Sequence, residues 1–454
     1  MHDSALALLL SRGQFAFTIG LHIVLAAFAL GLAQFLALME GLWLFRRKKV
    51  CEEVYRFWLK VFGLTTAVGA VSGVVMEFQF GTNWAPFAYK TGGIVGPLML
   101  YEVMVAFFLE SALAGVMIFG LGRIRPGIHF MVTLLVAAGA MVSAFWILAA
   151  NSWMQTPTGF TLDDAGIFHP DSWLTILRAP SFPWRLTHMI LAALIATAFL
   201  VAGVGAWRLL KNLQRPAARV MVSYALWLAV ILVPAQIVIG DLHGENTLRY
   251  QPQKIAAIEG SWRQPPAGQG EPVRLFALPD QHAATNHAEL AIPQLGSLYL
   301  RHNLHGHIKG LTEFPQADIP PVLPVFFAFR IMVGLGILML MVSLAALILR
   351  LRKRLFTSKS LLKILVLMSP AGFIAMISGW VVTEVGRQPW TVWGILRTAD
   401  SHSPLSDSLV ITSASAILIV YAFAFISGLR YFMRYADTEH DSEKYVEARE
   451  HDHA

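Results

Sequence analysis

Charged residues are scarce in this sequence, which has 454 residues, of which 14% are charged and 56% hydrophobic. A soluble protein carries about 25% charged residues, so the ordinary globular classes are excluded. Cysteine is almost absent, because Cys51 is the only one. This excludes an internal disulfide, a four-cysteine iron–sulfur site and the Cys-x-x-Cys-His attachment of a c-type haem. We interpret Cys51 as an ordinary free thiol.

Hydrophobic runs of about 20 residues recur along the chain, and each is long enough to cross a hydrocarbon core of about 30 Å. The sequence therefore predicts an all-α integral membrane protein with about nine transmembrane helices. The first run has no basic stretch before it, which favours a first span over a removed signal. The predicted spans are 13–45, 57–80, 94–121, 128–152, 184–207, 220–240, 322–349, 361–384 and 407–433.

Basic residues gather on one side of these spans. The formal net charge is +7, and in a membrane protein such an excess indicates topology rather than a nucleic acid partner. The turns after spans one, three, five and seven, together with the tail, hold 22 of the 35 Lys and Arg residues, whereas the opposite side holds 12. The basic side is then inside, which places the N-terminus outside and the C-terminus inside.

A polar stretch of 81 residues, 241–321, lies between spans six and seven and is predicted to be outside the membrane. Loops of that length are uncommon and usually functional. The chain accordingly divides into spans one to six (1–240), this outer loop, spans seven to nine (322–435) and a charged inner tail (436–454).

Ionisable side chains inside membrane spans are costly, so each is a candidate functional residue. The sequence has no HExxH, CxxC, P-loop or G-x-S-x-G motif in a suitable context, whereas histidine and methionine are common axial ligands of haem iron. The candidates are His22, Glu77, Glu102, Glu110, His188, Arg330, Met332 and Glu384.

The depth of these residues is also informative. His22, His188 and Glu384 fall in the outer part of the membrane, with His22 about 13 Å along its predicted span. Glu102 and Glu110 are eight residues apart, which an α-helix places about 80° apart around its axis and about 12 Å apart along it. We expect them to form an inward-leading pair of proton acceptors, with Glu110 about 24 Å deep.

Several strings occur in a fixed order between about residue 10 and about residue 435. They are SRGQFAFTIGLH, MEFQFGTNW, YEVMVAFFLES, WILAANSWMQTP, QPQKIAAIEG, FAFRIMV and EVGRQPW. In this combination the sequence resembles subunit I of the cytochrome bd-type quinol oxidases. The resemblance implies a nine-span protein of the bacterial cytoplasmic membrane with its N-terminus outside, as the charge pattern also predicts.

The resemblance implies that His188 and Met332 bind the iron of a low-spin haem b, with Arg330 beside the haem propionates. His22 matches an axial histidine of a high-spin haem pair, and Glu384 matches the carboxylate that serves the other haem of that pair. Which haem each residue serves stays open. The expected cofactors are a low-spin haem b, a high-spin haem b, and either haem d or a third haem b.

Other functional positions are implied by the same motifs. Glu102 matches a glutamate close to the haem pair, and Glu110 matches one on the proton route. Trp380 matches a tryptophan between haems, and Arg387 of the GRQPW string is expected to bind cofactor.

The loop motif QPQKIAAIEG resembles the quinol-binding segment of the family and contains Lys254 and Glu259. Its KIAAIE stretch predicts a short helix at the membrane surface. The loop is the short form, without the long insertion of some members. Short-loop members include a cyanide-insensitive branch, in which some proteins carry a third haem b in place of haem d.

The expected function is that of the catalytic subunit of an electrogenic terminal oxidase, which oxidises quinol outside and reduces O₂ to water with protons from the inside. The expected partners are subunit II, a small single-span subunit, quinol, O₂ and the lipid bilayer. Two other functions stay open. One is a dihaem b quinone-reactive membrane anchor, and the other is a haem-free transporter that uses His22, Glu102 and Glu110 as a proton relay.

Three histidines, His302, His305 and His307, gather near the end of the loop. Three nearby histidines can form a metal site. A solvated loop face is the favoured interpretation.

Overall fold

The computed structural model describes residues 5–213, 215–266 and 269–437, and among them it contains nine helices long and apolar enough to cross a membrane. The prediction of about nine spans in an all-α protein is confirmed. The spans are α1 (Ala5–Arg46), α2 (Lys49–Thr82), α4 to α5 (Val95–Phe119), α6 (Pro126–Gln155), α8 (Phe182–Leu210), α9 (Arg215–Tyr250), α12 (Val322–Leu351), α13 to α14 (Lys359–Val385) and α15 (Asp407–Asp437).

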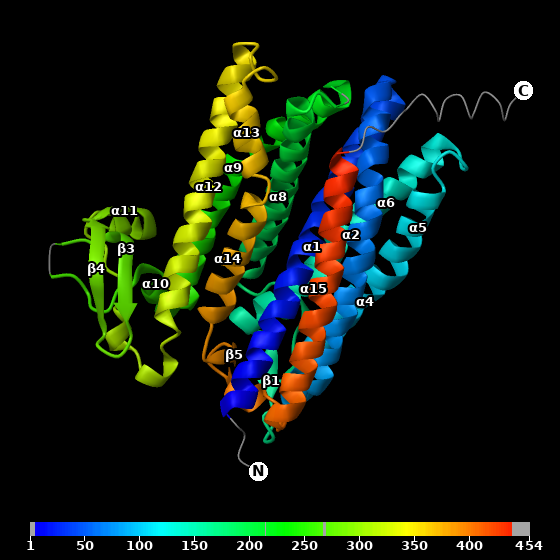
Figure 1. Cartoon of the computed structure of the whole chain (residues 1–454). Coiled ribbons are helices and arrows are strands. Elements are labelled where there is room, and N and C mark those ends of the chain that lie inside the picture. Colours follow the sequence, from blue (N-terminus) through cyan, green and yellow to red (C-terminus); the bar gives the residue numbers. More distant parts are fainter. Residues whose placement is uncertain (1–4, 214, 267–268, 438–454) are drawn as a thin grey trace, which may run out of the picture.

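The spans run side by side in one bundle, and the two ends of the described chain lie at opposite ends of it (Figure 1). Helix α1 packs against α2, α6 and α8, while α8 packs against α9 and α12 packs against α14. We call the end at which α1 begins the loop end. The opposite end, where α1 finishes at Arg46, is the basic end. A large apolar core around Leu32, Met39 and Trp58 fills the basic half of the bundle.

The third span is not a continuous α-helix. It consists of α4 (Val95–Val103), a π-helical segment η1 (Met104–Glu110) and α5 (Ser111–Phe119). The sequence predicted an unbroken α-helix here. A π-helix is wider than an α-helix because each N–H bonds five residues back, and such segments are frequent at functional sites.

The eighth span is also divided, into α13 (Lys359–Leu367) and α14 (Ala371–Val385). Pro370 stands directly before α14. Proline has no N–H to donate and its ring collides with the preceding turn, so the first helix ends before it. The sequence predicted one span across this break.

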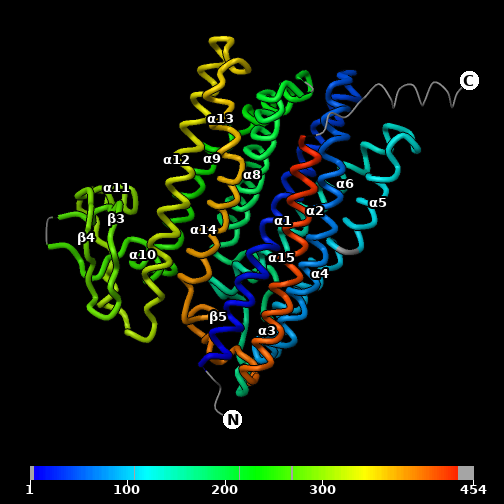
Figure 2. Tube along the Cα trace, in the orientation of Figure 1, coloured from blue at the N-terminus to red at the C-terminus, as the bar shows by residue number. Residues whose placement is uncertain are grey.

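The segment 241–321 has a structure of its own. Helix α9 continues through Tyr250, beyond the predicted end of span six at residue 240, so the start of this segment is helical. The remainder lies beside α12 (Figures 1 and 2). Its elements are α10 (Pro252–Glu259), β3 (Val273–Asp280), β4 (Thr285–Ile292), α11 (Leu295–Arg301), η2 (Leu311–Glu313) and η3 (Gln316–Asp318).

Strands β3 and β4 form an antiparallel hairpin whose register runs from Val273 opposite Ile292 to Asp280 opposite Thr285. Short elements cover the loop end of the bundle near the start of α1 (Figure 1). They are α3 (Ala85–Thr91), β1 (Phe160–Leu162), β2 (Phe168–Pro170), α7 (Trp173–Leu177), β5 (Trp390–Val392), β6 (Leu396–Arg397) and η4 (Ala399–Ser401). The predicted charged tail lies outside the described residues from 438 onward.

Candidate functional site

His22 lies in α1 against α2, and its hydrogen bonds define its protonation state. Its Nδ1 is 2.9 Å from the Ser72 hydroxyl, which itself donates to the Gly69 carbonyl at 2.7 Å. The Ser72 oxygen therefore accepts from Nδ1–H of His22. In the neutral imidazole, this hydrogen bond leaves Nε2 of His22 unprotonated and able to bind a metal. A Cβ atom at Gly73 would lie 3.2 Å from Cε1 of His22, so the ring lies close against the α2 backbone.

His188 lies in α8 and faces α9. The Gln236 amide nitrogen is 3.3 Å from Nε2 of His188, and the ring centre of His243 is 5.7 Å from that of His188. Nδ1 of His188 is buried and has no hydrogen-bond partner among the described residues. A Cβ atom at Gly240 would lie 3.3 Å from Cε1 of His188. The imidazole is therefore held by close packing and a single polar contact.

Met332 lies in α12 and faces α14. A Cβ atom at Gly379 would lie 2.9 Å from the Met332 sulfur, so the absence of a side chain at Gly379 leaves room for the Met332 thioether. The next residue, Trp380, belongs to an apolar cluster that contains Ile23 of α1 and Met189 of α8. Trp380 thus packs with the residues that directly follow His22 and His188 in the sequence.

Glu384, near the end of α14, is the centre of a polar cluster at the loop end. Its Oε1 accepts from the Asn151 amide at 2.9 Å and the Gln155 amide at 3.3 Å. Its Oε2 accepts from Arg387. Two further buried guanidinium N–H groups of Arg387, and two of Arg185, have no hydrogen-bond partner within the described part of the chain. Such donors are suited to binding anionic groups such as carboxylates or phosphates.

Lys254 in α10 points toward this cluster. Its Nζ donates to the Gln155 side chain at 2.8 Å, and the Gln251 amide donates to the same oxygen at 3.0 Å. Burial, reinforced by the positive charge of Arg185, lowers the pKa of Lys254 well below its ordinary value. The short helix that the sequence predicted for this segment is confirmed.

Glu259, at the other end of α10, lies in a different environment. The Tyr299 hydroxyl donates to its Oε1, and Nη2 of Arg330 is 3.9 Å from its Oε2. Burial raises the pKa of Glu259, and burial together with the charge of Glu259 raises the pKa of Tyr299. Lys254 and Glu259 are five positions apart in α10. An α-helix places such residues about 140° apart around its axis, so the two side chains face nearly opposite sides.

Arg330 in α12 connects the membrane span to the loop. Its guanidinium donates to the carbonyls of Ile258 at 2.6 Å and Arg274 at 2.7 Å. Arg274 in turn pairs with Glu271 at 2.8 Å and donates to the Glu259 carbonyl. The predicted position of Arg330 beside haem propionates stays a prediction.

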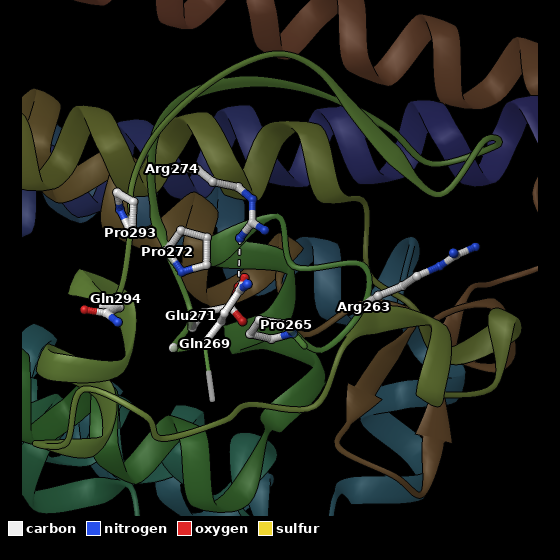
Figure 3. A pocket seen from close by; sticks show the side chains of 9 residues that line it. Arg263, Pro265, Gln269, Glu271, Pro272, Arg274, Pro293 and Gln294 are labelled. Atoms are coloured by element: carbon white, nitrogen blue, oxygen red, sulfur yellow. Dashed lines mark hydrogen bonds and ion pairs between the residues drawn. The ribbon is translucent and has the colours of Figure 1, made fainter. Parts of the chain in front are cut away.

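Arg274 and Glu271 also line a cavity of about 330 Å³ in the loop, where their side chains point toward one another (Figure 3). Pro272, Pro293 and Gln294 form part of the same wall. The cavity therefore borders the charged groups that hold the Glu259 end of α10.

Glu102 and Glu110 both meet α6. The Ser143 hydroxyl donates to Glu102 at 3.1 Å, and a Cβ atom at Gly139 would lie 2.9 Å from Cγ of Glu110. Gly139 and Ser143 are one turn apart on α6, so the two glutamates face the same side of it. The predicted separation of 80° assumed an α-helix throughout, whereas Met104–Glu110 is the π-helical η1 segment. Glu77 lines a cavity of about 650 Å³ between α2 and this span.

The loop histidines do not gather around one point. His302 lies against α9, with its Nδ1 3.1 Å from Glu245 and its Nε2 3.7 Å from Asp241. Its side chain is 62% exposed, which agrees with a solvated loop face. The side chains of Asp241, Glu245 and His302 could reach one cation, since one ligand atom of each lies within 4.8 Å of the others.

Sequence reasoning missed four residues that contact the predicted ones, namely Asn151, Gln155, Arg185 and His243. Asn151 and Gln155 lie within the string WILAANSWMQTP that carries the resemblance, so that string was the available signal. His243 was assigned to the loop because α9 was expected to end at residue 240.

Comparison with known proteins identifies the family of the chain. The chain matches the family described as cytochrome bd terminal oxidase subunit I over residues 10–440. It is similar to the cytochrome bd ubiquinol oxidase subunit 1 of Bacillus subtilis (strain 168), with 35% identity over 92% of this chain and 89% of the relative. It is also similar to the cytochrome bd-II ubiquinol oxidase subunit 1 of Escherichia coli (strain K12), with 31% identity over 94% of this chain and 96% of the relative.

The fold is similar to that of a solved structure, the bd oxidase from Geobacillus thermodenitrificans. The TM-score is 0.88 and the sequence identity 26%, over 95% of this chain and 99% of the other. The architecture and the sequence thus lead to the same group of proteins. This chain belongs to the cytochrome bd terminal oxidase subunit I family.

Proposed function

We propose that this multi-pass bacterial membrane protein is the haem-bearing catalytic subunit of a respiratory oxidase that oxidises quinol and reduces O₂ to water. The observation that carries the proposal is its family relationship, which extends over nearly the whole chain. The relatives are named ubiquinol oxidase subunits 1, so a subunit II is the expected partner. Two quinols give up four electrons and four protons, and one O₂ takes up the same number to give two waters.

The chemistry of several of these residues suits haem. His22 offers an unprotonated Nε2, and the imidazole of His188 is fixed by few polar contacts. Arg185 and Arg387 hold buried N–H groups that suit haem propionates. We assign His188 and Met332 to a low-spin haem b, and His22 and Glu384 to the high-spin pair. When bound, haem iron supplies the one-electron chemistry and the O₂ binding.

The chain itself provides the proton chemistry of quinol oxidation at α10. Burial lowers the pKa of Lys254, so its neutral amine can accept a proton from one quinol hydroxyl and become charged. Burial raises the pKa of Glu259, which makes its carboxylate a stronger base that accepts a proton from a quinol hydroxyl and becomes neutral. Tyr299 and Arg330 hold the Glu259 carboxyl in place from two sides. The loop end would then be the outer face, with the N-terminus outside and the C-terminus inside.

The protons for water formation are proposed to come from the inside. A route from the outside would conserve little energy, whereas each charge moved across the membrane is worth about 2.3 kcal/mol per 100 mV. Glu110 and Glu102 both face α6 and form a sequence of carboxyls along it. We propose that they pass protons toward the loop end.

The absorption spectrum of the purified complex tests the proposed function. We expect a reduced-minus-oxidised spectrum with low-spin and high-spin haem, a CO-reactive component and quinol-dependent O₂ consumption. The same spectrum distinguishes haem d from a third haem b. A colourless protein would favour the proton-coupled transporter, and haem without CO reactivity would favour the quinone-reactive anchor.

The α10 residues should affect substrate kinetics rather than cofactor binding. We expect Lys254→Leu and Glu259→Gln each to raise the apparent KM for quinol by up to about tenfold, because a lost hydrogen bond costs up to about 1.5 kcal/mol. Haem spectra should stay normal. The measurement is steady-state quinol oxidation in the purified complex, with exposed Lys309→Leu in the same loop as the matched control. Unaltered quinol kinetics in both variants would place the quinol site elsewhere.

A further inference from the structure

A buried polar cluster at the basic end has no role in the site described above. Glu40 of α1 and His129 of α6 are each only 2% exposed, and Oε1 of Glu40 lies 2.6 Å from Nδ1 of His129. The Thr133 hydroxyl donates to Oε2 of Glu40 at 2.5 Å, and the Tyr55 hydroxyl is 3.2 Å from that of Thr133. A buried carboxyl inside a membrane span is costly, so such a pair calls for a function.

The hydrogen bonds of His129 require one hydrogen between its imidazole and the Glu40 carboxyl. Nε2 of His129 is 2.9 Å from the Met117 carbonyl, which can only accept, so Nε2 carries a hydrogen. The contact between Nδ1 and Glu40 then needs one more hydrogen, which resides either on the imidazole or on the carboxyl. Both arrangements have the same net charge, so a transfer of the proton between the two groups leaves the charge of the pair unchanged.

The pair also lies in line with the glutamates of the third span. His129, Gly139 and Ser143 fall within about 80° of one another around α6, and Gly139 and Ser143 are the contacts of Glu110 and Glu102. His129 is about 15 Å from Gly139 along the helix. Oε1 of Glu110 is buried and has no hydrogen-bond partner among the residues described by the structure, so it is free to receive one.

Polar groups occupy the interval between them. The Gln34 amide of α1 donates to the Ala137 carbonyl at 2.6 Å, which lies one turn beyond Thr133 toward Glu110. On the other side of the pair, Arg56 lies close enough to influence both His129 and Tyr55 electrostatically, and it is bound to Glu52 at the basic end. The pair therefore lies between charged groups at the basic surface and the Glu110 carboxyl.

We propose that Glu40 and His129 form the proton-loading site at the inner end of the route to Glu110, with water bridging the interval along α6. A proton arriving from the basic surface binds the pair, and the pair releases its shared proton toward Glu110. The inference rests on the proposed function, because it takes the basic end as the inner face and Glu110 as the next acceptor.

Glu40→Gln is the sharpest test, because it keeps the geometry and removes the proton exchange. Its amide oxygen can accept from Thr133 and its NH₂ can donate to Nδ1 of His129. Positioned proton-transfer groups contribute about 100-fold or more to rates, so we expect charge separation in reconstituted vesicles to slow about tenfold or more. Haem content, haem reduction by quinol and Tm should remain normal. Glu53→Gln is the matched control, since it removes a carboxyl of α2 at the same end and leaves the Arg56–Glu52 ion pair in place.

A parallel Glu110→Gln variant separates this inference from the proposed function. If Glu110→Gln is slow and Glu40→Gln has wild-type charge separation, the proton-loading site is wrong and the route through Glu110 stands. If both variants behave as wild type, the route itself is wrong. If Glu40→Gln loses haem or Tm, Thr133→Val decides the matter, because it removes the hydroxyl that donates to Glu40 at nearly constant shape. Slowed charge separation in a folded Thr133→Val variant supports the inference, and wild-type charge separation in that variant overturns it.

Discussion

Replacement of His22 by alanine is expected to abolish quinol-driven O₂ consumption while the low-spin haem signal remains. His22 offers the Nε2 that the Ser72 hydrogen bond leaves unprotonated, and alanine has no atom that could replace it. Loss of partners that merely orient a metal ligand lowers activity about 10 to 100-fold, so loss of the ligand itself should exceed about 100-fold. The checks are O₂ consumption with excess quinol and the spectrum of the CO-treated complex.

The control for this variant is His169→Ala, which removes an exposed histidine of β2 that pairs with Asp163. It should leave both the spectrum and O₂ consumption unchanged. Full quinol oxidase activity in His22→Ala would show that His22 is a packing residue. The high-spin site would then have to be sought around Glu384 alone.

Changes at His188 and Met332 are expected to give the opposite result. A six-coordinate low-spin iron needs both axial ligands, so His188→Ala or Met332→Leu should abolish the low-spin band or convert it to a high-spin one. CO binding should be largely preserved, because the proposed CO-reactive site lies at His22 and Glu384. Quinol oxidation should fall in both variants together with the low-spin signal.

Met332→Leu has a well-matched control on the same helix. Met341 is 54% exposed on α12 and faces away from the bundle, so Met341→Leu should leave all spectra unchanged. The measurement is the reduced-minus-oxidised spectrum at low temperature, with and without CO. An unchanged low-spin band in both His188→Ala and Met332→Leu would remove this ligand assignment.

The spans were predictable because a run of about 20 apolar residues has few alternatives to a membrane helix. Ionisable residues such as His22 and Glu384 were also predictable as functional residues, because an ionisable side chain within an apolar run is costly. Neutral amides carry a weaker signal. Asn151 and Gln155 bind Glu384, yet nothing in composition or charge marks them as different from other polar residues in the spans.

The π-helical segment of the third span was not predictable. The stretch MVAFFLE contains neither proline nor glycine, and its local preference is for an ordinary helix. The contacts of Glu102 and Glu110 with α6 join residues that are far apart in the sequence. The periodicity of a single sequence carries no information about such contacts. Glu40 and His129 escaped notice because each lies near the end of a predicted span, where ionisable residues are common.

The two-sided attachment of α10 has a mechanical consequence. This eight-residue helix is joined through Lys254 and Gln155 to α6, and through the Ile258 carbonyl and Arg330 to α12. It therefore acts as a rigid strut between two spans that come from distant parts of the sequence. One inserted residue would turn one attachment about 100° away from its partner while leaving the other in place. The length of α10, and not only its charges, thus limits how far α6 and α12 can slide past each other.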